Sequence, residues 1–224
     1  EWYRDRVHPA ASRRRLTLAL VCAEPLKPWE MARPFWTEPD GRLVEADFLC
    51  RQFVTSRWLP DTPPPPDAVP VTRITVIIRP TKTFAEYDER RYLVEMQDRL
   101  RGLEVGVAYD SGAVSEKLGQ GEASVVHFLT PPGELAEDDG QELAGFRQTR
   151  PLVFVNAHTR DPDRLQLTGL GRWAQRFIRA GCSAFVGPLW EVDDALAFQF
   201  AVEFYEALWA GRPLAEALDQ ARKR

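Results

Sequence analysis

Two hydrophobic patterns alternate along the C-terminal two thirds of the chain. Short apolar runs rich in β-branched residues are separated by longer segments whose apolar positions recur every three or four residues. The short runs predict strands at 72–79, 103–109, 123–129, 152–157 and 184–189. The longer segments predict helices at 85–101, 114–118, 169–180 and 194–209, and a last helix that begins at Pro213. This alternation is typical of a three-layer α/β/α domain, in which helices cover both faces of a mostly parallel central sheet.

The N-terminal part of the chain has a weaker pattern. Residues 1–15 are polar and rich in arginine, and we expect them to be a linker or the tail of an upstream region. An apolar run predicts a strand at 16–22, and the stretch 48–59 is expected to form a strand or a hairpin arm. Residues 60–70 contain six prolines, which exclude helix and central strand and favour an extended, exposed loop. Because the chain begins with Glu1 rather than Met, we expect it to be part of a longer protein.

Composition narrows the class of protein. With 44% hydrophobic and 28% charged residues among 224, the chain is typical of a soluble globular protein. The net charge of −4 gives no basic field for nucleic acid, and no apolar run approaches the roughly 20 residues of a membrane span. Cys22, Cys50 and Cys182 form neither a CxxC pair nor a disulfide framework, which excludes ribbon-type zinc sites and favours a cytoplasmic location. We therefore expect no cofactor, no nucleic-acid partner and no membrane partner.

The carboxyl ends of the predicted strands are where functional residues gather in folds of this kind. That rule points to the segments after Leu129, Ala157 and Leu189. The charges of the 85–101 helix are expected to form a solvated face. The acidic loop 134–142 is expected to be solvated too, with a gate or a partner contact as its alternative interpretation.

Several motifs at these strand ends resemble the CHAT family, in the same order along the chain. Residues 125–131, VVHFLTP, resemble the family strand that ends in His-Phe-x-x-His. Residues 152–158, LVFVNAH, resemble the apolar strand that ends in Asn-Ala-Cys, and residues 181–192 resemble the Ala-Gly-Ala strand that ends in Trp. Further likenesses are the Pro-Trp-Glu of residues 28–30, the β-arm at 48–60 and the helical close at 198–222.

This resemblance implies the caspase–separase clan fold, so the α/β/α domain is expected to be caspase-like. The likeness spans residues 16–224, which makes the proline-rich segment 60–70 an internal loop of one domain. In active members the family implies a cysteine endopeptidase. It also implies upstream repeat or sensor domains and a setting in bacterial defence or signalling.

The two catalytic positions of the family hold different residues in this chain. The family histidine falls at Pro131, which has no side-chain base, and the family cysteine falls at His158, which has no sulfur. His127 lies about 13 Å before position 131 along an extended strand, too far to replace the base. We expect His127 to be a structural histidine bonded to neighbouring backbone, and Cys182 to be a buried, inert thiol.

Other interpretations of single residues stay open. His158 is conceivable as an imidazole nucleophile, although it would need an oxyanion hole and a proton donor. Asp161 and Asp163 share its loop, but a catalytic zinc needs about three well-placed ligands, so we expect a solvated turn and no metal. Asp193 and Asp194 are expected to cap a helix, with a wall of the cleft as the alternative. Trp190 is compatible with either cleft or core.

The sequence leads to three hypotheses of function. The first is a catalytically inactive CHAT-like pseudoprotease that binds a protein or peptide, with strand addition at a sheet edge as one binding mode. The second is a peptidase or hydrolase that uses His158 or residues supplied by a partner, and the third is a purely structural domain. The residues expected to line the cleft are His127, Leu129, Asn156, Ala157, Trp190 and Asp193.

Overall fold

The chain divides into two compact units, Glu1–Asp61 and Thr62–Arg224. The structure is a computed structural model that describes residues 3–11, 16–21, 31–63, 66, 68–78, 84–129, 143–156, 167–188 and 192–223. The division falls inside the proline-rich segment 60–70, which the sequence predicts to be a loop within one domain. That single-domain assignment stays a prediction, and each unit is described by itself below.

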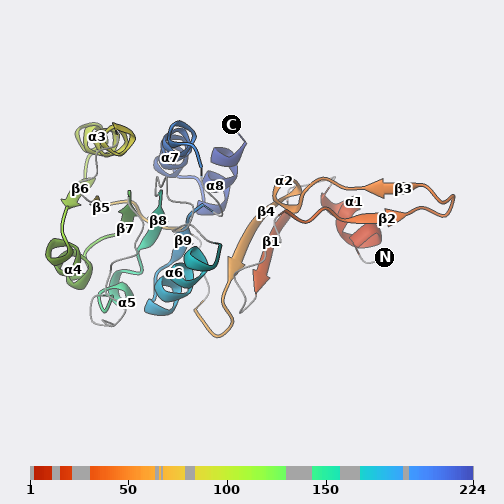
Figure 1. Ribbon diagram of the computed structural model, residues 1–224, viewed down its shortest axis with the longest axis horizontal. Coiled ribbons are helices and arrows are strands. Elements are labelled where there is room, and N and C mark those ends of the chain that lie inside the picture. The colour runs from red at the N-terminus through yellow and green to blue at the C-terminus, as the bar shows by residue number, and fades with distance from the viewer. Residues whose placement is uncertain are drawn as a thin grey trace. The chain divides into compact units, whose positions relative to one another are not determined.

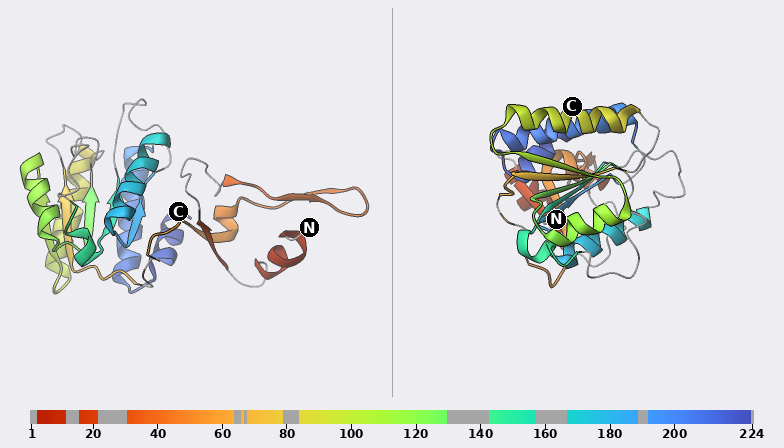
Figure 2. Two further views of the ribbon diagram at one scale, coloured as in Figure 1. Left: turned by 90° about the horizontal axis from the view of Figure 1, so that it is seen from below. Right: turned by 90° about the vertical axis from the view of Figure 1, so that its left-hand side faces the viewer.

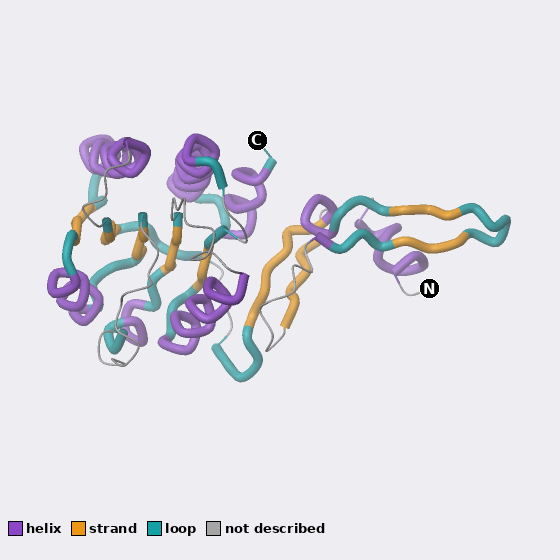
Figure 3. The backbone as a smooth tube through the Cα atoms, viewed as in Figure 1, coloured by secondary structure: helices purple, strands orange, loops and turns teal. Residues whose placement is uncertain are grey.

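The first unit contains two small sheets. Its elements are η1 (Tyr3–Val7), α1 (His8–Ala11), β1 (Leu16–Val21), β2 (Phe35–Thr37), β3 (Leu43–Glu45), α2 (Leu49–Gln52) and β4 (Phe53–Trp58). β1 pairs with β4 in parallel, and β2 and β3 form an antiparallel hairpin that Figure 3 traces. The strand expected across 48–59 is therefore too long, because its first residues form the short helix α2. The hairpin was not predicted, since three-residue strands carry too little alternation to detect.

The second unit is built on a five-stranded sheet. Its strands are β5 (Arg73–Ile77), β6 (Glu104–Ala108), β7 (Val125–Phe128), β8 (Leu152–Val155) and β9 (Ala184–Val186). They lie in the order β6-β5-β7-β8-β9, and every neighbouring pair is parallel, as Figure 1 shows. The predicted strands and the mostly parallel sheet are confirmed.

Helices cover both faces of this sheet. They are α3 (Phe84–Arg99), α4 (Ser111–Gln120), α5 (Phe146–Thr149), α6 (Leu167–Ala180), α7 (Asp194–Trp209) and α8 (Leu214–Arg222). The right-hand view of Figure 2 shows α3 and α7 on one face and α4 and α6 on the other. The three-layer α/β/α arrangement expected from the sequence is therefore confirmed. Pro213 is the residue before α8 rather than its first helical residue.

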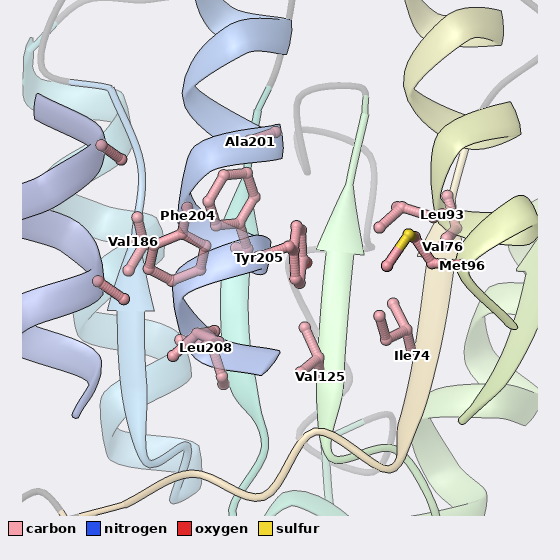
Figure 4. Close-up of a cluster of buried hydrophobic side chains, with 14 of the residues drawn as sticks. Ile74, Val76, Leu93, Met96, Val125, Val186, Ala201, Phe204, Tyr205 and Leu208 are labelled. Carbon is pink, nitrogen blue, oxygen red and sulfur yellow. The ribbon is translucent and has the colours of Figure 1, made fainter. Parts of the chain in front are cut away.

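The core of the second unit has an aliphatic and aromatic layer on each face of the sheet. On the α3–α7 face, Ile74, Val76 and Val125 of the strands pack with Leu93 of α3 and Phe204 of α7, as Figure 4 shows. On the opposite face, the ring of Phe177 of α6 stacks on those of Phe146 and Phe185 and packs at a tilt against that of Phe128. The strands are therefore buried on both sides, which explains why their sequences are continuous apolar runs.

Two glycines allow α4 and α5 to meet closely. A Cβ atom placed on Gly145 would lie 2.5 Å from Gly121 Cα and 2.7 Å from the Leu118 carbonyl oxygen. Both neighbours are backbone atoms, so no side chain can turn away to make room. Gly145 itself has φ −63°, which any residue adopts, so the demand for glycine at this position is purely steric.

We expect Gly145→Ala to destabilise the fold by about 1–3 kcal/mol, because the added methyl group must push two backbone segments apart. Urea unfolding followed by circular dichroism measures the change. The control is Gly119→Ala in α4, where an added Cβ meets nothing within 4 Å. That substitution is expected to leave stability unchanged or to raise it by about 0.5–1 kcal/mol. Equal unfolding midpoints for the two variants would contradict the steric argument.

Candidate functional site

His127 lies in the interior of the second unit rather than on an open surface. Its side chain is 0% exposed, and it projects from β7 toward the layer of α3 and α7. The imidazole stacks on Phe154 of β8, with ring centroids 4.8 Å apart, and on Tyr205 of α7. Its Nδ1 lies 2.8 Å from the Tyr205 hydroxyl. The expected structural role is consistent with this burial, but the expected backbone partner is wrong: this ring nitrogen bonds a side chain.

The other imidazole nitrogen faces the carboxylate of Glu89 in α3. His127 Nε2 lies 2.9 Å from Glu89 Oε1, and both side chains are 0% exposed. The two atoms are within ion-pair distance, although Nε2 makes no hydrogen bond to the described residues. The expectation that the charges of this helix form a solvated face is therefore wrong for Glu89. It lies four residues before Leu93 and seven before Met96, so it shares their buried stripe.

Asn156 completes the group from the end of β8. Its Nδ2 donates to both carboxylate oxygens of Glu89, at 3.0 and 2.8 Å, and to the Ala197 carbonyl of α7 at 2.9 Å. We call Glu89, His127, Asn156 and Tyr205 the buried polar cluster. It joins α3, β7, β8 and α7 inside a core that is otherwise apolar.

The chemistry of the donors and acceptors favours one placement of protons in the buried polar cluster. A carboxylate accepts hydrogen bonds and cannot donate them, which favours the tautomer with hydrogen on the imidazole nitrogen that faces Glu89. In that tautomer Nδ1 accepts from the hydroxyl of Tyr205. Burial, together with the negative charge of Glu89, raises the pKa of Tyr205 well above 10.0, so the phenol keeps the proton that it donates.

The start of α7 is fixed from outside the buried polar cluster as well. The Asp193 carboxylate accepts from the backbone N–H groups of Ala195 and Leu196. This is the N-cap expected from the sequence, and it satisfies two donors that the first helical turn leaves unpaired. A role of Asp193 in a cleft is not tested by this contact.

The residues expected to line a cleft have different surroundings. Leu129 and His127 are 0% exposed and Asn156 is 7% exposed, so these three side chains belong to the core. Asp193 is exposed. The remaining positions of interest lie outside the described residues: Pro131, the acidic loop 134–142, Ala157, His158, Asp161, Asp163 and Trp190.

Comparison with known families identifies the chain. The family model described as CHAT domain matches residues 10–224, which is nearly the whole sequence and both compact units. The chain belongs to the CHAT family. CHAT domains are a caspase-like, peptidase-related family, and the all-parallel five-stranded sheet with helices on both faces is consistent with that fold. No curated protein matches the chain.

Two of the three thiols of this CHAT domain lie within the described residues. Cys182 is 2% exposed, and burial raises the pKa of its thiol to about 12, against smaller opposing effects of the Ala184 backbone and Arg150. A thiol with that pKa is almost entirely protonated near neutral pH, and the thiolate is the nucleophilic form. The expected inert character of Cys182 is supported. Cys50 is free and half-buried in α2 of the first unit, and Cys22 lies outside the described residues.

In the part of the chain that the structure describes, no group of three or more His, Cys, Asp or Glu side chains could hold a metal ion. Among the helices described, none is long and apolar enough to cross a membrane.

The raised pKa of Cys182 predicts a pH dependence of stability. In the unfolded chain the thiol releases its proton near pH 9, whereas the folded chain retains it up to about pH 12. The unfolded state therefore binds fewer protons in this window, and the unfolding free energy falls as pH rises from 9 to 12. Below pH 9 the thiol has no effect on the slope.

We expect Cys182→Ala to remove about one proton from the slope of unfolding free energy against pH between pH 9 and 12. Urea titrations at half-unit steps of pH measure the slope in the wild type and the variant. Tyr205 contributes to the slope of both proteins above pH 10, so their difference isolates the thiol. Identical slopes would show that Cys182 loses its proton equally easily in both states.

Proposed function

We propose that this CHAT domain is catalytically inactive and acts as a protein- or peptide-binding module. The observation that carries the proposal is the loss of both residues of the family dyad, with Pro131 in place of the histidine and His158 in place of the cysteine. Proline cannot accept a proton through its side chain, and imidazole cannot form the thioester intermediate of a cysteine peptidase. The chain therefore lacks both the base and the nucleophile of the family reaction at these two positions.

The surroundings of His127 support the proposal. A replacement base must reach the substrate, yet this imidazole is fully buried, with one nitrogen on Tyr205 and the other beside Glu89. The buried, protonated thiol of Cys182 is equally unsuited to attack a peptide. His127 therefore cannot replace the catalytic base, and Cys182 cannot replace the nucleophile, of a cysteine peptidase.

A binding role is consistent with what the chain retains. The buried polar cluster and the apolar core hold the strands of the caspase-like sheet in place without the family dyad. In parallel α/β sheets the carboxyl ends of the strands form the surface to which ligands bind. We propose that a protein or peptide partner binds there, in a bacterial defence or signalling protein of several domains.

The catalytic half of the proposal is tested with the purified chain and a mixture of fluorogenic peptides that vary in the residue before the cleaved bond. We expect the rate of cleavage to equal that of a buffer blank. It should not change in the His158→Ala variant or after treatment of all thiols with iodoacetamide. Both comparisons use the same protein preparation.

Two results would contradict inactivity. Cleavage that disappears in His158→Ala would establish an imidazole nucleophile. Cleavage that iodoacetamide abolishes would establish one of the three cysteines as the nucleophile.

The binding half of the proposal is tested separately by selecting displayed random peptides on the folded chain, with the urea-unfolded chain as control. Failure to enrich any peptide on the folded chain would count against a peptide-binding cleft.

A further inference from the structure

The buried carboxylate of Glu89 is connected, directly or through Asn156, to three segments of the chain: β7, the end of β8 and the first turn of α7. His127 is in β7, two residues before the last described residue of that segment, Leu129. Asn156 is the residue directly after β8. Ala197 is in the first turn of α7, the helix that follows β9. His127 and Asn156 both contact Glu89 of α3, and Asn156 in turn donates to the Ala197 carbonyl; Glu89 lies on the face of the sheet where α3 and α7 pack.

Asn156 is the residue through which Glu89 reaches α7. Its single amide nitrogen contacts three acceptors: both oxygens of Glu89 and the Ala197 carbonyl. With two hydrogens for three acceptors, the amide plane has little freedom to rotate while the contacts are kept. The backbone of Asn156 is anchored too, because its N–H donates to the Phe128 carbonyl of β7 at 2.8 Å. The end of β8 is thereby connected to β7, α3 and α7 at once.

The position of Glu89 requires these partners. A carboxylate without solvent is stable only where donors or positive charge compensate for its lost hydration. Among the described contacts of Glu89, the partners are His127 of β7 and Asn156 at the end of β8, so moving either strand away from α3 would leave the charge less compensated. The need to compensate the charge of Glu89 therefore restricts where the backbones of β7 and β8 can lie, as well as how their side chains pack.

We propose that Glu89 is a positioning residue: it fixes the ends of β7 and β8 and the first turn of α7 relative to one another, so that the strand-end surface of this CHAT domain is held as one rigid unit. The inference deepens the proposed function, since it concerns the surface to which the partner is proposed to bind. It differs from a general contribution to stability, because it assigns a local effect to a single contact.

Glu89→Gln is the sharpest test because glutamine has nearly the same shape. Oε1 of Glu89 faces His127 Nε2 and Asn156 Nδ2, and Oε2 faces Asn156 Nδ2. In either orientation, the new amide nitrogen of glutamine therefore meets a donor. The matched control is Tyr205→Phe, which removes a hydrogen bond from the same cluster but leaves the contacts of Asn156 with Glu89 and Ala197 in place.

Hydrogen exchange of single backbone amides, followed by NMR, gives the readout. The amides to follow are those of Asn156 and Ala197, which donate to the Phe128 and Asp193 carbonyls. The protected amides of α4 serve as the internal reference, since α4 covers the other face of the sheet. We expect Glu89→Gln to speed exchange at Asn156 and Ala197 by about tenfold relative to α4, and Tyr205→Phe to leave that ratio at the wild-type value.

The imidazole supplies a second readout. Long-range ¹⁵N–¹H spectra of the wild type are expected to show His127 with hydrogen on Nε2, and Glu89→Gln is expected to change the ¹⁵N shifts of the ring. If glutamine prevents folding, Asn156→Ala tests the same link. It removes the connection to Ala197 and leaves the imidazole beside Glu89, so it should speed exchange at Ala197 relative to α4.

The proposal is overturned if Glu89→Gln and Asn156→Ala accelerate exchange uniformly across α4 and α7, or if Tyr205→Phe alters the ratio as much as they do. In either case Glu89 would be an ordinary core residue. Because no partner or substrate enters the measurement, that result would leave the proposed binding function untouched. Conversely, discovery of peptidase activity would not change the exchange ratios.

Discussion

The fold of the second unit depends on an uncommon constraint, a carboxylate that is fully removed from solvent. An apolar core tolerates small rearrangements, because apolar contacts have no required direction. The carboxylate of Glu89 is less permissive, since losing a donor leaves a charge in a medium that cannot hydrate it. Two of its partners come from β7 and from the end of β8, and one of them, Asn156, also bonds α7. α3, β7 and β8 must therefore arrive in register for these contacts with the charge to form.

This arrangement separates the residues that maintain the fold from those that perform family chemistry. The resemblance to the family places its catalytic positions just beyond two residues of the buried polar cluster along the chain, at Pro131 four residues after His127 and at His158 two residues after Asn156. The contacts described for the buried polar cluster involve neither a thiol nor a second imidazole. These described contacts therefore hold the strands without the family's catalytic side chains, which is the physical basis of the proposal that this chain is a binding module.

Much of the fold could be predicted from the sequence because strand and helix periods are local. The strand at 72–79 and the helix at 194–209 were expected within a few residues of β5 and α7. The hairpin of β2 and β3 was not predicted, because its strands are too short to show a hydrophobic period. In the candidate site His127 and Asn156 were singled out, but Glu89 was assigned to a solvated face, and nothing in the pattern of the 194–209 helix pointed to a polar contact of Tyr205.

The sequence by itself determined the order of strands and helices along the chain, the parallel α/β class, the resemblance to the CHAT family at the strand ends, and the presence of proline at 131 and histidine at 158. Only the tertiary structure decided what the remaining polar residues do. Glu89 and His127 are 38 positions apart, and Asn156 is 67 positions from Glu89, so no local pattern links them. Whether a charged side chain faces water or a buried amide depends on which elements pack over it, and that is settled only when the sheet and its helices are assembled.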